Sequence, residues 1–139
     1  MRLRNLQGRD CTVSHKPHLI DWDPKREVSG PQGEVKRFLR PYWERDIVLE
    51  ELPIPGSRLR LDLVNVNQGI VVEVSPFSSH SFNPFFHKSL AGFQNALKRD
   101  IKKEDWVVRI MGWRYAEIVC ETDFPLSAEL FEERFGIIL

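Results

Sequence analysis

The sequence predicts a mixed α/β domain in which helices flank a mixed central sheet. Two observations lead to this prediction. Three short segments rich in Val, Leu and Ile follow one another over residues 46–75, with turn signals between them. A longer segment beginning at Asn83-Pro84 repeats its apolar residues every three or four positions, and another strand-like segment follows it. The predicted order is helix, three strands, helix, strand and helix.

The first predicted helix lies within residues 29–43. It begins at a Ser-Gly-Pro start signal, and we expect it to end at Pro41. Its apolar residues fall on one side of a helix: Val35, Phe38, Leu39 and Tyr42.

Three strands are expected next, over residues 46–54, 57–66 and 69–75. Pro55-Gly56 separates the first two, and a tight connection at Asn67-Gln68 joins the last two. We therefore expect the second and third strands to form an antiparallel hairpin.

The second helix begins with Asn83 as N-cap and Pro84 at the first helical position. We expect it to pack on the sheet over residues 84–103 and to continue, with a break, to Gly112. The residues expected to face the sheet are Phe86, Leu90, Phe93, Leu97 and Ile101, with Val108 and Met111 continuing the stripe. A strand over 113–120 and a helix over 127–136, stopped by Gly136, complete the domain.

Length and composition favour one domain. The chain has 139 residues, with 20 basic and 20 acidic side chains. Residues 1–28 are polar and irregular, and we interpret them as an N-terminal arm outside the core, before a single domain over 29–139. No apolar run is long enough to span a bilayer and no signal peptide is evident, so we expect a soluble, cytoplasmic protein without membrane contact.

Asp62 and Glu73 are the most informative polar residues. If the hairpin loop is Asn67-Gln68 or the four residues 66–69, Asp62 lies directly opposite Glu73 on one face of the sheet. Two like charges at that spacing repel, so a cation such as Mg²⁺ is expected between them. The alternative is a pair of edge carboxylates that form salt bridges with Arg58 or Arg60.

Four segments together resemble a known family: "EELPIPGSRLRLDLVN", "IVVEVSPFSSH", "FFHKSLAGFQNALKRDIKK" and "GWRYAEI". Their order is similar to that of the PD-(D/E)XK nucleases. Within that superfamily they resemble the very-short-patch-repair (Vsr-like) endonuclease branch, which includes domains of phage-borne homing endonucleases. The resemblance covers about residues 29–120 and implies a restriction-endonuclease-like core. It also implies a Mg²⁺-dependent endonuclease acting on double-stranded DNA, with Mn²⁺ as a substitute ion.

The resemblance implies roles for individual residues. Asp62 and Glu73 would be the metal ligands, and His80, or alternatively His87, would transfer protons. Asp100 would match an aspartate of the long helix, and the upstream acid would be Glu34 or Glu51. Basic residues expected at DNA phosphates are Lys36, Arg37, Arg40, Arg58, Lys98, Arg99, Lys102 and Lys103.

The sequence also departs from the family pattern. Ser75 stands where the general motif has lysine, which leaves histidine, or Lys98 as a migrated lysine, for that role. A structural zinc of the repair enzyme has no cysteine cluster here, although Cys11, His15 and His18, with Asp21 or Asp23, have a spacing that zinc ligands can have.

Other functions are compatible with the same core. They are a catalytically inactive module that binds DNA or protein, and a nuclease acting on Holliday junctions or transposon ends. The oligomeric state is left open, a homodimer included.

Overall fold

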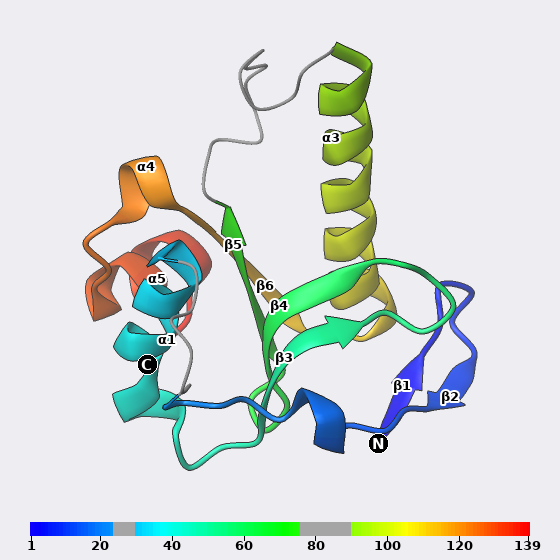
Figure 1. The fold of residues 1–139 in the computed structure, drawn as a ribbon, viewed down its shortest axis with the longest axis horizontal. Coiled ribbons are helices and arrows are strands. Elements are labelled where there is room, and N and C mark those ends of the chain that lie inside the picture. The colour runs from blue at the N-terminus through cyan, green and yellow to red at the C-terminus, as the bar shows by residue number, and fades with distance from the viewer. Residues whose placement is uncertain (24–29, 76–89) are drawn as a thin grey trace.

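Four strands form one mixed sheet with helices on both faces (Figure 1). The computed structural model describes residues 1–23, 30–75 and 90–139. The strand order is β3-β4-β5-β6, antiparallel except for the parallel pair β5–β6. The mixed α/β class predicted from the sequence is confirmed. The strands are β3 (Val48–Pro53), β4 (Arg60–Asn65), β5 (Ile70–Ser75) and β6 (Arg114–Val119).

One face of the sheet is covered by α1 (Gly30–Trp43) and α5 (Ala128–Phe135), which follows the short α4 (Cys120–Asp123). α1 contributes Val35, Leu39 and Trp43 to this apolar core, at the spacing of one helical face. The predicted end at Pro41 is wrong. Pro41 lies inside the last turn of α1, and the helix runs on to Trp43 although proline cannot donate an intrahelical hydrogen bond there.

The β4–β5 hairpin has the register expected from the sequence. Asn65 pairs with Ile70 and Leu63 with Val72, so the loop contains residues 66–69. Gly69 fixes this turn, because its φ of 65° suits glycine and an added Cβ would lie 2.9 Å from Trp113 Cδ1. Continued by one residue, the same register places Asp62 opposite Glu73.

The other face is covered by α3 (Leu90–Asp105) and the π-helical turn η2 (Trp106–Ile110). The predicted packing stripe is wrong at Ile101, whose side chain is 66% exposed. Trp106 and Val107 are fully buried instead, so the helix is turned about its axis relative to the prediction. Phe86 and the side chains of Leu90 and Phe93 lie outside the described part. Among the described residues, no helix has the length and apolar character needed to cross a membrane.

The N-terminal segment also differs from its prediction as an arm outside the core. It contains β1 (Arg2–Arg4) and β2 (Asp10–Thr12), which form an antiparallel pair, and the 3₁₀ turn η1 (Lys16–His18). Leu3 is only 2% exposed and packs in the same core cluster as Trp106 and Val107. A single buried leucine within a polar segment was too weak a sequence signal to reveal this docking.

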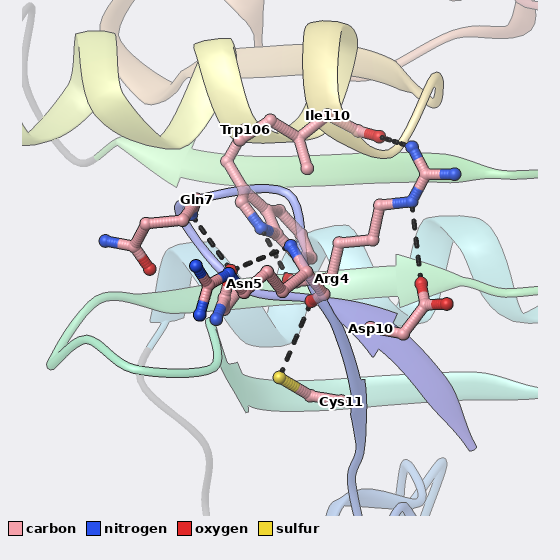
Figure 2. Close-up of polar contacts among 8 residues, drawn as sticks. Arg4, Asn5, Gln7, Asp10, Cys11, Trp106 and Ile110 are labelled. Atoms are coloured by element: carbon pink, nitrogen blue, oxygen red, sulfur yellow. Dashed lines mark hydrogen bonds and ion pairs between the residues drawn. The ribbon is translucent and has the colours of Figure 1, made fainter.

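The β1–β2 hairpin holds the end of α3, as Figure 2 shows. Trp106 Nε1 donates a hydrogen bond of 2.9 Å to the Arg4 carbonyl, and Arg4 Nη1 donates one of 3.2 Å to the Ile110 carbonyl. These bonds join the first residues of the chain to the helix end. The N-terminal hairpin is therefore part of the support that positions α3 on the sheet.

Trp106→Phe should test this support. Phenylalanine keeps an aromatic ring but loses the N–H, leaves the Arg4 carbonyl without that donor and fills less space. We expect the free energy of unfolding to fall by about 1–3 kcal/mol, measured by urea denaturation. Trp113→Phe is the matched control, because Trp113 Nε1 has no hydrogen bond to a described residue. Equal losses in both variants would show that ring volume, and not the bond to Arg4, is what matters.

Candidate functional site

A polar cleft of about 380 Å³ opens between α3 and the β3–β4 hairpin. Both carboxylates and cations line it, in contrast to the apolar core on the opposite face of the sheet. Its lining residues are Glu51, Arg58, Leu59, Arg60, Asp62, Ala96, Arg99, Asp100 and Lys103. The cleft therefore brings together residues from three segments that are well separated in the sequence.

Asp62 and Glu73 interlock at the edge of this cleft. The Asp62 N–H donates to Glu73 Oε2 over 2.8 Å, and the Val74 N–H donates to Asp62 Oδ2 over 2.8 Å. The backbone pairing of β4 with β5 ends one residue earlier, at Leu63 and Val72. Carboxylate oxygens thus accept backbone N–H groups where the ladder stops, which fixes both side chains.

Lys103 of α3 reaches Glu73 from across the cleft. Its Nζ lies 3.0 Å from Glu73 Oε1, and the two side chains are 21% and 7% exposed. Glu73 Oε1 is buried and accepts no hydrogen bond from a described residue. The contact with Lys103 is therefore an ion pair without hydrogen-bond geometry. Glu73 therefore retains one oxygen that can accept a further donor or a cation.

Burial, and then the negative charge of Asp62, raises the pKa of Glu73 from 4.5 to about 8. The charge of Lys103 and the bond from the Asp62 N–H act in the opposite direction but do not cancel this effect. The metal-free pair therefore holds a proton at neutral pH.

Two further acidic residues lie in line with Asp62 and Glu73 across the strands of the sheet. Glu117 of β6 is the parallel partner of Glu73, and Glu51 stands opposite Asp62 in the β3–β4 register. Glu51 has a φ of 53°, a conformation that costs a non-glycine residue about 1–3 kcal/mol. Its Oε1 accepts a hydrogen bond of 3.3 Å from Gln32 Nε2.

Tyr115 lies beside these acidic residues. Burial, followed by the charges of Glu73 and Glu117, raises the pKa of its hydroxyl above the ordinary value. The phenol therefore stays neutral at this site.

The structure separates the other predicted residues into two groups. Asp100, Arg58 and Arg99 line the cleft, whereas Lys98 and Lys102 are exposed and are not among its lining residues.

The predicted residues of α1 lie on the opposite face of the sheet. Lys36 is buried against Glu50 at 3.0 Å, and Arg37 pairs with Glu34 at 3.1 Å. Arg40 forms ion pairs with Asp23 and Glu44. His80 and His87 lie outside the described residues.

Neither Arg58 nor Arg60 forms an ion pair with Asp62 or Glu73 among the described residues, so the edge salt bridge considered from the sequence is not observed there. Lys103 supplies the positive charge, a role that the sequence analysis did not assign to it. The available signal was its position on α3, seven residues after the small Ala96 and three after Asp100. Glu117 was also missed in the sequence analysis. Alternation along β6 places it on the face of the sheet opposite to that of the buried Ala116 and Ile118.

The two carboxylates would offer oxygen ligands to a divalent cation of the Mg²⁺ type, at a place where the Lys103 ammonium already lies 3.0 Å from Glu73 Oε1. The second oxygen of Glu73 has no hydrogen bond from a described residue, and Mg²⁺ needs only one or two carboxylates, with water and phosphate completing its shell. The described residues hold no group of three or more His, Cys, Asp or Glu placed to bind a metal. Cys11, His15, His18, Asp21 and Asp23 therefore do not form the zinc site considered from the sequence.

No protein-family model, curated protein or solved structure matches the chain.

The pKa of Glu73 predicts how stability depends on pH. Because the folded-state pKa lies above the unfolded value, the metal-free protein has its full stabilisation below about pH 4.5 and loses it as pH rises through about 8. Glu73→Gln mimics the protonated group, so the stability of wild type relative to this variant should fall over that range. Thermal melts in EDTA at several pH values measure it.

Two further variants sharpen the measurement. Lys103→Met removes the charge that lowers the folded-state pKa of Glu73, so the fall should begin at the same pH and extend to higher pH. Glu34→Gln alters an exposed carboxylate on the opposite face and should leave the wild-type dependence unchanged. A stability difference between wild type and Glu73→Gln that is the same at every pH would contradict the raised pKa.

Proposed function

We propose that the chain is a metal-dependent DNA endonuclease with a restriction-endonuclease-like core, of the Vsr-like or homing type. The observation that carries the proposal is the Asp62–Glu73 pair, in which Glu73 is buried against the repulsion of Asp62 and Asp62 lines the cleft. A purely structural pair would be less costly as amides or apolar residues. Carboxylates retained in this arrangement are typical of a site that takes up a cation.

Asp62 and Glu73 would hold the ion, which we propose to be Mg²⁺ with Mn²⁺ as a substitute. Lewis-acid polarisation of the scissile phosphate is the chemistry that such an ion supplies in a nuclease. Lys103 adds a fixed positive charge that favours the ionised form of Glu73. In the proposal, this residue takes the place of the motif lysine that Ser75 replaces, in preference to the exposed Lys98.

The rim of the cleft favours a phosphodiester substrate. Arg58, Arg60 and Arg99 line it together with the acids. Guanidinium groups bind phosphate oxygens through directed hydrogen bonds, and the negative charge of DNA needs such counter-charges near the carboxylates. The proposal therefore assigns these three arginines to the phosphates that flank the scissile bond.

Hydrolysis breaks the bond between phosphorus and the leaving oxygen, and water supplies the new oxygen. The attacking water loses a proton and the leaving oxygen gains one. His80 or His87 is proposed for one of these transfers, since imidazole changes its protonation near neutral pH. For the upstream acid, the position of Glu51 at the cleft favours it over Glu34.

Asp62→Asn should abolish cleavage while leaving the protein folded. Asparagine keeps an oxygen for the Val74 N–H but removes the charge that attracts a divalent cation. Without metal and above about pH 8, where Glu73 is ionised, the loss of repulsion with Glu73 should stabilise the protein by about 1 kcal/mol. Nicking of supercoiled, mismatched and branched DNA, with Mg²⁺, Mn²⁺ or EDTA, measures activity. Titration calorimetry with Mg²⁺ measures cation binding, and thermal melts in EDTA measure the stability of the metal-free protein.

Asp10→Asn, a change at an exposed residue of the N-terminal hairpin, is the matched control and should cleave like wild type. If Asp62→Asn is less stable in EDTA and still cleaves DNA, Asp62 is structural and the proposal is wrong. If the wild-type protein binds DNA but cleaves none of the substrates with either metal, the inactive binding module is the better description.

Substitution of the histidines tests the proton transfer. Replacing the catalytic one of His80 and His87 by Ala should lower cleavage by about 10²–10⁴-fold. Mg²⁺ affinity should stay nearly unchanged, because the proposed ligands are carboxylates. The role is wrong if both single variants cleave at the wild-type rate.

A further inference from the structure

The outer face of α3 and of the following η2 turn carries an apolar stripe, defined here by Leu97 and Ile101 of α3 and Val108 of η2. Ile101 is 66% exposed and Val108 is 47% exposed, although both belong to the periodic pattern that the sequence assigns to the core. Figure 1 shows α3 at the periphery of the molecule, with the sheet on its inner side. Exposed apolar side chains in one row on a helix mark an interaction surface.

This stripe contains a hollow of about 250 Å³, lined by Ile101, Glu104, Asp105, Val108 and Arg109. The first three are spaced i, i+3 and i+4 on α3, and Val108 and Arg109 of η2 close the hollow. A hollow between neighbouring residues of a helix receives one side chain of a second helix in knobs-into-holes packing. The shape of the face therefore suits a second helix.

The charges beside the stripe indicate which helix. Lys98 precedes Ile101 by three residues and Asp105 follows it by four, so both lie on the same side of Ile101 around the helix. In an antiparallel pair of α3 helices that cross near Ile101, the same flanks face each other, so Lys98 of each copy lies beside Asp105 of the other. Both charge pairs form at once because the arrangement is two-fold symmetric.

We propose that α3 mediates an antiparallel, two-fold symmetric homodimer, with Ile101 of each copy in the hollow of the other. Among the described residues of the single chain, the ion-pair partner of Asp105 is Arg109, at 3.2 Å; the side chains are 49% and 82% exposed, which leaves Asp105 accessible to the partner copy. One helix pair buries a small area, so the association is weak and depends on concentration. The proposal does not depend on nuclease activity, because the cleft lies on the inner side of α3.

Charge exchange provides the test, by sedimentation equilibrium of the full chain at low ionic strength. Wild type should dimerise as concentration rises. Lys98→Glu places like charges opposite each other in the homodimer, and so does Asp105→Lys. Each variant alone should therefore raise the dissociation constant by about 10-fold or more. An equimolar mixture of the two should recover dimers, because both charge pairs are attractive in the mixed dimer.

Ile101→Asp should abolish association, whereas Ile138→Asp, at an isoleucine that is 75% exposed elsewhere, should leave it unchanged. Circular dichroism checks that each variant is folded, and exposure of Ile101 makes unfolding an unexpected result. A wild type that stays monomeric at all concentrations, or a mixture no more associated than its separate components, would overturn the proposal.

Discussion

The burial of Glu73 beside Asp62 is the constraint on which the arrangement of the cleft depends. Two carboxylates on neighbouring strands repel, and removal from water makes each charge more costly. The structure offsets this cost with two backbone N–H donors, from Asp62 and Val74, and with the Lys103 ammonium. The remaining imbalance appears as the raised pKa of Glu73. The strand ends, the helix and the open cleft all follow from placing these groups together.

The same constraint explains the orientation of α3. Its inner side has to deliver Lys103 to Glu73, so residues along that side line a polar cleft. Large apolar groups, Trp106 and Val107, are buried in the η2 turn that follows α3. The π-helical turn and the N-terminal hairpin anchor that end. The apolar residues of α3 that precede this turn are consequently left on the outer side of the helix, where Ile101 is exposed.

Local signals were sufficient to predict the strands and the hairpin register. Alternation, turn residues and loop length determine pairing between neighbours in sequence, and Asp62 opposite Glu73 followed from them. The rotation of α3 was not predictable in this way, because an apolar stripe does not reveal whether it faces a core or a partner. Lys103 was missed as the partner of Glu73 for a related reason: the pair joins residues 30 positions apart, across a segment outside the described part. The docking of Leu3 depends equally on distant contacts.

The placement of Lys103 changes how the departure from the nuclease motif is interpreted. By sequence, Ser75 removes the lysine and weakens the case for catalysis. In three dimensions, Lys103 of α3 lies 3.0 Å from Glu73, the second acid of the proposed motif, so the type of charge that the proposal requires is present although its position in the chain differs. A catalytic site requires a charged group at a particular position in space, and the fold can supply that group from any helix or strand close enough to the site. The missing motif lysine is therefore weak evidence against the proposed endonuclease, and the carboxylate pair becomes the feature on which that proposal depends.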